Sequence, residues 1–239
     1  MAKFRFIEIP KKIFLKVLKK FEYPYVYPDL LFSGHYKIWN QRRFDFVNAY
    51  LFDIDKNNLS LLEISAGHAN LSRLFLHSGF DITCTDGREE HITWMNNKFP
   101  TIKTKQINLD STYPETIKYN IVIHFGVLYH LIDPLKHLND FFKKQDFDHL
   151  FLETEVANYP DKNFVLKLKE NGYDQSMSYI GGRPSAQAIE KVLKEFDLNW
   201  TRHDDINLNS TFHNYNWKED DTPETYRIGM RRFYHIKKR

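Results

Sequence analysis

The sequence is nearly free of cysteine and has no long hydrophobic run. Its single cysteine, Cys84, excludes an intrachain disulfide framework and a cysteine-rich zinc site. No stretch approaches the roughly 20 apolar residues that a membrane-spanning helix needs. The opening MAKFRFIEIPKKIFLKVLKKF is interrupted by lysines and lacks the small-residue cleavage site of a signal peptide. These absences predict a cytoplasmic protein that keeps its N-terminal segment and has no membrane span.

An excess of charge of one sign is also missing. The chain of 239 residues has 34 basic and 31 acidic residues, and the net charge of +3 does not by itself indicate a nucleic-acid partner. No histidine pair or carboxylate cluster has the spacing of metal ligands. Neither a G-x-S-x-G nucleophile turn nor a phosphate-binding lysine loop occurs. We therefore predict no metal site.

The chain does contain enough apolar surface to fold, because hydrophobic residues make up 42% of it and aromatic residues 16%. Its length fits one α/β domain better than two. From about residue 59, strand-like runs alternate with helical patterns, which predicts βαβ units and a largely parallel sheet. The strand-like runs are 60–65, 80–85, 101–109, 120–125 and 149–153, and the helical patterns are 69–79, 89–99 and 133–145.

The last third of the chain changes character. A helical run follows Pro184 and Ser185, and two strand-like runs, 198–203 and 226–236, then occur without a helix between them. Strands joined in this way pair antiparallel, because a parallel return needs a long crossover. The predicted fold class is α/β, with a doubly wound, mostly parallel seven-stranded sheet that includes an antiparallel C-terminal strand pair.

Residues 1–58 precede this sheet and are predicted to form a helical extension or lid on the main domain, residues 59–239. One helical pattern covers 42–52, and 154–184 is expected to be a loop region. Between Ile13 and Phe21, apolar residues recur at helical spacing with lysines on the other side. Such a helix packs on its own domain or lies on a membrane surface or an anionic partner.

Acidic and small residues mark the carboxyl ends of the first strands, where ligands bind in an open parallel sheet. After the first strand, Ser65, Ala66, Gly67 and Ala69 form a small-residue turn. Asp86 lies about 20 residues further on, where a carboxylate accepts hydrogen bonds from ribose hydroxyls. Asp110 is expected to end the third strand and to reach an adenine amino group. The predicted cofactor residues are Glu63, Ser65, Gly67, Asp86, Gly87, Asp110 and Phe125.

The string YNIVIHFGVLYHLIDPLKHL, residues 119–138, resembles the fourth-strand motif of class I S-adenosylmethionine-dependent methyltransferases. The resemblance extends in order and spacing over residues 59–236. It implies a Rossmann-like fold in which 59–239 is the cofactor-binding domain. It also implies S-adenosylmethionine as the cofactor, S-adenosylhomocysteine as the product, and Asp86 as the ribose acid. Ser65 and Ala69 depart from the family, which usually has glycine at both positions.

Methyl transfer from a sulfonium is an in-line displacement, so alignment of the acceptor supplies much of the rate. His130 is a candidate general base for a hydroxyl acceptor, and the competing interpretation is a structural residue of the motif. Tyr129 is placed to face the cationic sulfonium. Both residues are predicted to be catalytic.

Loops that leave the carboxyl ends of the strands carry many aromatic residues, which suit a sugar, an aromatic ring or an unstacked base. We predict that Tyr36, Tyr179 and Arg183 bind the acceptor, with Arg183 on an anionic group. The leading hypothesis is a methyltransferase for a small molecule such as a sugar or another metabolite. The alternatives are an RNA-modifying methyltransferase acting on tRNA, and a methyltransferase-like binding module without turnover. A nicotinamide-dependent oxidoreductase is the weakest, because G-x-G-x-x-G is absent.

Overall fold

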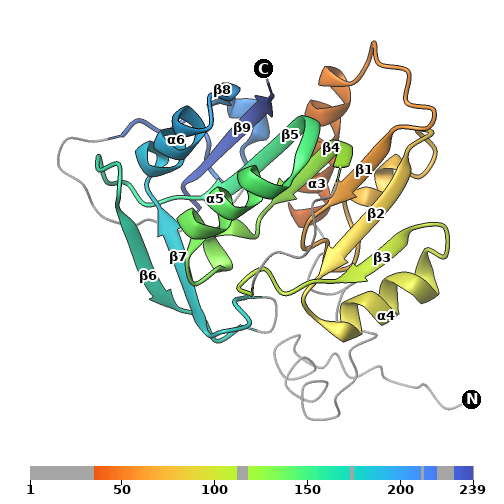
Figure 1. Cartoon of the computed structure of the whole chain (residues 1–239), viewed down its shortest axis with the longest axis horizontal. Helices are drawn as coiled ribbons and strands as arrows, with labels where there is room; N and C mark the ends of the chain where they lie inside the picture. The colour runs from red at the N-terminus through yellow and green to blue at the C-terminus, as the bar shows by residue number, and fades with distance from the viewer. Residues whose placement is uncertain (1–34, 112–117, 173–174, 211–212, 220–228, 239) are drawn as a thin grey trace, which may run out of the picture.

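The computed structural model describes residues 35–111, 118–172, 175–210, 213–219 and 229–238, with the side chains described from residue 37 onward. The predicted lysine-faced helix near the N-terminus lies outside the described residues. Within them, seven strands form one sheet in the order β3-β2-β1-β4-β5-β9-β8 (Figure 1). The strands are β1 (Ser60–Glu63), β2 (Asp81–Asp86), β3 (Lys103–Gln106), β4 (Lys118–Phe125), β5 (Asp146–Glu155), β8 (Asn199–His203) and β9 (Arg231–Lys237).

The pairing of these strands confirms the predicted sheet. The neighbouring pairs from β3 to β5 are all parallel. Strand β9 runs antiparallel to β5 on one side and to β8 on the other, so the C-terminal pair closes one edge of the sheet. From β1 the chain adds β2 and β3 on one side of the sheet, and from β4 it adds β5 on the other side. This reversal between β1 and β4 places a ligand crevice between their carboxyl ends.

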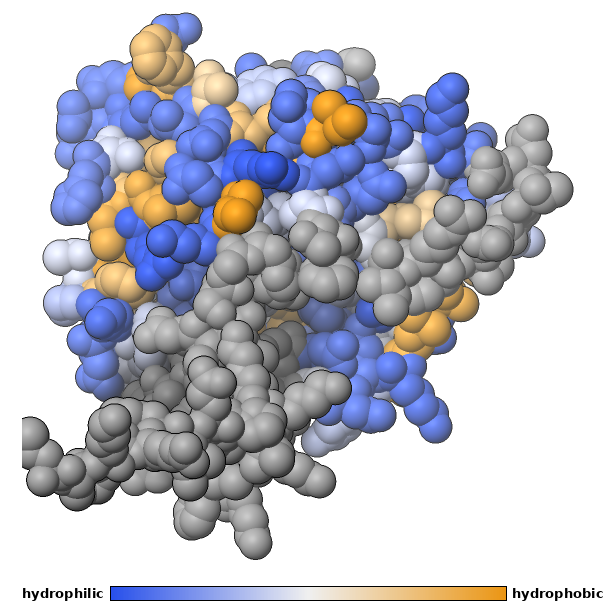
Figure 2. All heavy atoms as spheres, turned by 180° about the vertical axis from the view of Figure 1, so that it is seen from behind, coloured by the Kyte–Doolittle hydropathy of each residue, from blue (hydrophilic) through white to orange (hydrophobic). Residues whose placement is uncertain are grey.

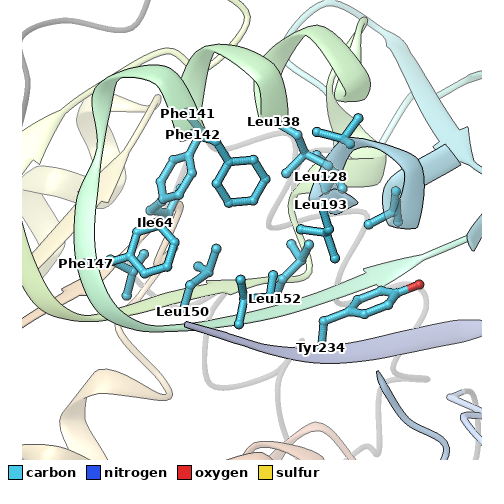
Figure 3. Packing of buried hydrophobic residues seen from close by; sticks show 14 of the residues in the cluster. Ile64, Leu128, Leu138, Phe141, Phe142, Phe147, Leu150, Leu152, Leu193 and Tyr234 are labelled. Atoms are coloured by element: carbon cyan, nitrogen blue, oxygen red, sulfur yellow. The ribbon is translucent and has the colours of Figure 1, made fainter. Parts of the chain in front are cut away.

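Residues that alternate along each strand supply two separate cores. Leu62 faces a core built with α5 (Pro134–Lys144) and α6 (Ala186–Glu195), whereas Leu61 faces a core on the opposite side of the sheet. Figure 3 shows Phe141 and Phe142 of α5 packed among Leu150, Leu152 and other side chains of the first core. The sheet is therefore covered on both faces, as parallel sheets require.

The two covering helices begin at residues that accept backbone hydrogen bonds. The Asp133 side chain accepts from the amide of Lys136, with Pro134 in the first turn of α5. The Ser185 side chain accepts from the amide of Ala188 at the start of α6. The predicted helices 133–145 and 89–99 correspond to α5 and α4 (Glu89–Lys98).

The helix α3 (His35–Tyr50) starts earlier than the predicted pattern 42–52. Residues at a spacing of four lie on one face of it, and Trp39, Arg43, Val47 and Leu51 along this line are all buried. Val47 and Leu51 pack in the second core. Trp39 and Arg43 extend the same face toward the carboxyl ends of the strands.

Three predictions about local structure are wrong. Residues 69–79 form only the 3-10 helix η1 (Ser72–Phe75) within turns, since Leu74, Leu76 and Ser78 each bond to the carbonyl three residues back. The region 154–184, expected to be a loop, contains the antiparallel hairpin of β6 (Val165–Lys169) and β7 (Ile180–Pro184). Strands β1 and β3 end earlier than expected.

The hairpin stands outside the main sheet, beside α5 and the short helix η2 (Leu128–His130), as Figure 1 shows. Seen from behind the view of Figure 1, the described part of the surface is largely hydrophilic, with scattered hydrophobic residues (Figure 2). Among the described helices, none is both long and apolar enough to cross a membrane.

Candidate functional site

A cavity of about 230 Å³ opens at the carboxyl ends of β1, β2 and β4. Residues from α3, from the turns after these strands and from the segment 175–177 line it. All of the predicted cofactor residues and both predicted catalytic residues are among them: Glu63, Ser65, Gly67, Asp86, Gly87, Asp110, Phe125, Tyr129 and His130. The structure thus brings together residues that are spread along the sequence from position 63 to position 130.

The turn after β1 has the backbone shape that usually calls for glycine. Ser65, Gly67 and Ala69 have φ values of 52°, 57° and 51°. The turn is fixed by the Ala66 amide, which donates to the carbonyl of Thr85 at 2.8 Å. A Cβ built on Gly67 meets nothing within 4 Å, so the backbone here faces open space. The turn keeps its glycine-like conformation although two of the three positions are not glycine.

Asp86 is the last residue of β2, and its hydrogen bonds connect the turn after β1 with the turn after β2. Its Oδ2 accepts from the amide of Gly67 at 2.9 Å, and its Oδ1 accepts from the amide of Arg88 at 2.9 Å and contacts Nδ1 of His91 at 3.0 Å. Burial alone disfavours the charged form, but these hydrogen bonds outweigh it and lower the pKa of Asp86. The carboxylate stays ionised, and Oδ2 retains acceptor capacity toward the cavity.

Glu63, at the end of β1, is a buried carboxyl group. Its Oε2 accepts from the amide of Ser72 at 3.0 Å and from the Ser72 hydroxyl. Burial raises the pKa of Glu63 to about 7, although the two hydrogen bonds from Ser72 act in the opposite direction. These same bonds hold the start of η1 against the strand end.

Asp110 does not end a strand as predicted, because β3 stops at Gln106. Its carboxylate instead joins two loops: Oδ1 accepts from the amide of Ile132 at 2.8 Å, and Oδ2 accepts from the Ser178 hydroxyl at 3.0 Å. The loop after β6 therefore reaches the cavity rim. A Cβ on Gly87 would lie 2.3 Å from the sulfur of Met177, so the turn after β2 and the loop between β6 and β7 approach closely there.

Helix α3 contributes a cation to the cavity that the sequence analysis did not single out. The Arg43 guanidinium stacks over the ring of Trp39 at 3.6 Å and lies 5.2 Å from the ring of Phe125. Its Nη1 lies 3.4 Å from Oε2 of Glu153, and its Nε has no hydrogen-bond partner among the described residues. Burial lowers the pKa of Arg43, with Glu153 acting against that effect.

Beneath Tyr129 lies a buried network centred on Glu153. Arg231 donates through Nη1 to Glu153 at 2.9 Å and through Nη2 to the Tyr129 hydroxyl at 3.0 Å. The Tyr215 hydroxyl also donates to Glu153, at 3.1 Å. Burial raises the pKa of Tyr129 to about 12, with Arg231 acting against it. The Tyr129 hydroxyl is therefore neutral, and a hydrogen bond from the Arg231 guanidinium holds it in place.

His130 is paired with a residue that the sequence analysis missed. Its Nδ1 lies 2.6 Å from Oε2 of Glu170, which directly follows β6. No pattern in the sequence points to Glu170, since it lies 40 positions away in a region expected to be a loop. The hairpin is what brings this carboxylate to the end of η2.

Of the three predicted acceptor residues, Arg183 and Tyr179 do not line the cavity. Arg183 is buried and forms ion pairs with Glu155 at 3.2 Å and Glu170 at 2.5 Å. Two carboxylates already neutralise Arg183, so its surroundings do not favour the predicted binding of an anionic acceptor group. Tyr179 is 68% exposed and is not among the lining residues. Tyr36 is the second residue of α3, and its side chain lies outside the described part of the chain.

In the part of the chain that the structure describes, no three histidine, cysteine or acidic side chains are grouped so as to hold a metal ion.

One comparison with known proteins identifies a family, and another identifies the fold. A sequence profile described as a methyltransferase domain matches residues 32–203, more than half of the chain. No curated protein matches this chain. Among solved structures, the N-terminal domain of EvdMO1 with S-adenosylhomocysteine bound has a TM-score of 0.63 at 12% identity, covering 97% of this chain and 98% of that chain. The same domain in the presence of S-adenosylhomocysteine and D-fucose has a TM-score of 0.58 at 13% identity, with coverages of 86% and 84%.

Two further structures share this fold. A methyltransferase from Clostridium acetobutylicum ATCC 824 has a TM-score of 0.56 at 14% identity, covering 93% of this chain and 99% of that chain. The 1,6-didemethyltoxoflavin-N1-methyltransferase of Burkholderia thailandensis, bound to 1,6-didemethyltoxoflavin and S-adenosylhomocysteine, has a TM-score of 0.55 at 11% identity, with coverages of 99% and 93%. At these identities the likeness concerns the fold.

Proposed function

The chain belongs to the class I S-adenosylmethionine-dependent methyltransferase family, and from this premise we propose that its methyl acceptor is a small molecule such as a sugar or another metabolite. One observation carries the proposal: a single cavity runs from the turn at Gly67 and Asp86 to Tyr129 and His130, walled by largely buried residues. Such a concave site suits a small acceptor beside the cofactor. Structures with a similar fold were obtained with D-fucose and with a heteroaromatic acceptor.

The residues around the cavity fit S-adenosylmethionine by charge. In our proposal the carboxylate of Asp86 holds the ribose hydroxyls, and Asp110 lies on the adenine side. Arg43, buried and with Nε unpartnered among the described residues, is suited to the methionine carboxylate. The open backbone at Gly67 allows close approach of the cofactor. Ser65 and Ala69 support this role because they retain the glycine-like backbone of the turn.

The cofactor supplies a methyl group on a positively charged sulfur, which is reactive without further activation. The chain then has to align the acceptor, exclude water and receive a proton where the acceptor carries one. The Tyr129 ring lies 4.8 Å from the Arg231 guanidinium and 5.2 Å from that of Arg183, so it already accommodates cations, and its hydroxyl accepts a hydrogen bond from Arg231. We propose that the segment up to residue 58 acts as the lid of the site, with α3 as the part that lines it.

Calorimetric titration with S-adenosylmethionine, S-adenosylhomocysteine and NAD tests the cofactor site directly. We expect micromolar binding of the two adenosyl ligands and no response to NAD. Turnover is then tested with S-adenosylmethionine carrying a ¹³C-labelled methyl group against D-fucose, 1,6-didemethyltoxoflavin and bulk tRNA. Labelled product from either small molecule supports the proposal. Label in tRNA alone contradicts it, and binding without turnover on any probe favours a binding module.

A further inference from the structure

We infer that Glu170 positions His130 as a general base, and that the methyl acceptor is therefore a hydroxyl group. The inference rests on the proposed function and specifies the acceptor. It starts from the short contact between Nδ1 of His130 and Oε2 of Glu170, 2.6 Å. The Glu170 side chain is 2% exposed and that of His130 16%, so the pair lies between the protein interior and the cavity.

Glu170 is itself held in a fixed orientation. Its Oε2 also accepts from the amide of Ser176 at 2.8 Å, and its Oε1 lies 2.5 Å from Nη1 of Arg183. Arg183 is anchored in turn by Glu155 at 3.2 Å. The hydrogen bonds at Oε2 and the ion pair at Oε1 hold this carboxylate against the imidazole, and the hairpin in this way orients the ring of His130.

The charge state of Glu170 determines which nitrogen of His130 is basic. Burial acts to raise the pKa of Glu170, but the hydrogen bond to His130 and the charge of Arg183 outweigh burial and lower it. An ionised carboxylate only accepts hydrogen bonds, so Nδ1 must carry the ring proton. The lone pair then lies on Nε2, the ring nitrogen that does not contact Glu170, and His130 lines the cavity.

A base of this kind serves acceptors that must lose a proton as they attack, and among these the hydroxyl is the group that a sugar acceptor offers. A carboxylate acceptor is already an anion near neutral pH, and a neutral amine attacks through its own lone pair. An alcohol loses its proton only with difficulty, so a positioned base accelerates its attack. In this step the acceptor oxygen bonds to the methyl carbon, and the carbon–sulfur bond breaks with its electron pair remaining on sulfur. The hydroxyl proton moves to Nε2 of His130, and Glu170 stabilises the resulting imidazolium.

The first test needs no acceptor. Nitrogen-15 NMR of the full chain with S-adenosylhomocysteine reads which nitrogen of the neutral His130 ring carries the proton. We expect the Nδ1–H tautomer in the wild type and its loss in Glu170→Ala. Glu155→Gln removes the other carboxylate of Arg183 and serves as the matched control, which should keep the Nδ1–H tautomer. An Nε2–H tautomer in the wild type overturns the inference, whatever the variants do.

The second test uses the ¹³C-methyl assay on D-fucose and 1,6-didemethyltoxoflavin, since the carbon chemical shift distinguishes a methyl on oxygen from one on nitrogen. We expect methyl on oxygen, and a kcat reduced about 10–100-fold in Glu170→Gln with unchanged affinity for S-adenosylhomocysteine. Methylation of nitrogen alone, or full kcat in Glu170→Gln, overturns the inference while leaving the small-molecule proposal intact. If neither probe is methylated, the proposed function loses its support, and the tautomer alone decides the pairing of His130 with Glu170.

Discussion

Ser65 occupies a backbone conformation that L-residues adopt at a cost. Its φ of 52° lies in the left-handed region, where a side chain costs roughly 1–2 kcal/mol. We expect Ser65→Gly to raise the free energy of unfolding by about 1 kcal/mol, because the lost strain exceeds the added freedom of the unfolded chain. Urea denaturation measures this. The neighbour Ala66 has no positive φ, so Ala66→Gly should lower stability instead; equal signs for the two variants contradict the argument.

Asp86 is the residue on which the proposed cofactor site depends most. Removing its charge while keeping its shape, in Asp86→Asn, should weaken S-adenosylhomocysteine binding about 10–100-fold, the equivalent of a hydrogen bond to a charged group worth ~1.5–3 kcal/mol. Calorimetry measures the change. Asp81 stands at the opposite end of the same strand and pairs with Lys103 at 2.6 Å. Asp81→Asn should bind normally, and a similar loss in both variants would indicate a general effect on β2.

For individual site residues, sequence patterns identified those that lie in or next to strand ends. They missed those that only tertiary packing brings to the cavity. Glu63, Asp86 and Phe125 line the cavity because the carboxyl ends of parallel strands meet at one edge. Arg43 comes from a helix that precedes the sheet, and Glu170 from the hairpin. The sequence also does not reveal that two carboxylates already neutralise Arg183.

The contact between β4 and α5 contains a buried histidine pair that makes stability depend on pH. Nε2 of His124 lies 2.9 Å from Nε2 of His137. Burial lowers the pKa of His124 to about 4 and that of His137 well below its ordinary value of 6.5. The unfolded chain therefore binds protons first as pH falls. Stability is full above about pH 6.5 and should fall between 6.5 and 4, by on the order of 3 kcal/mol for one such group.

Urea denaturation at intervals from pH 7.5 to pH 4 checks this prediction. The double variant His124→Leu/His137→Leu should show a flatter pH dependence than the wild type in that window. His77 is exposed, so His77→Gln is the control and should follow the wild-type curve. Parallel curves for the wild type and the double variant exclude the pair as the source of the acid sensitivity.

The elements that sequence patterns predicted well are those with a strong one-sided apolar pattern. In α5, the residues Leu138, Phe141 and Phe142 recur at helical spacing on the core face, and the helix was found with nearly correct ends. The strands of the hairpin have weaker signals: β6 reads VLKLK, and β7 reads IGGRP with two glycines. Pairing between them, rather than local preference, makes these segments strands.

Across the whole molecule, the cavity joins parts of the chain that pack on different sides of the sheet. Helix α3 belongs to the core on one face, η2 belongs to the core on the other, and both line the cavity. The loop from the hairpin is tied to the β2 side by the Arg88 side chain, which donates to the carbonyl of Gln175 at 2.6 Å. A ligand held there contacts segments from both cores, so its binding energy should stabilise the entire fold.

We therefore expect S-adenosylhomocysteine at about 100 times its Kd to raise the free energy of unfolding by about 2.7 kcal/mol, and Tm by roughly 5–10 °C for a chain of this size. Differential scanning calorimetry measures the shift, with NAD at the same concentration as the control. Hydrogen exchange should show greater protection of α3 as well as of the turn at Gly67, because Arg43 of α3 lines the cavity and is proposed to contact the cofactor. Protection confined to the turn, with α3 unchanged, would remove Arg43 from the cofactor site and leave Asp86 as its main anchor.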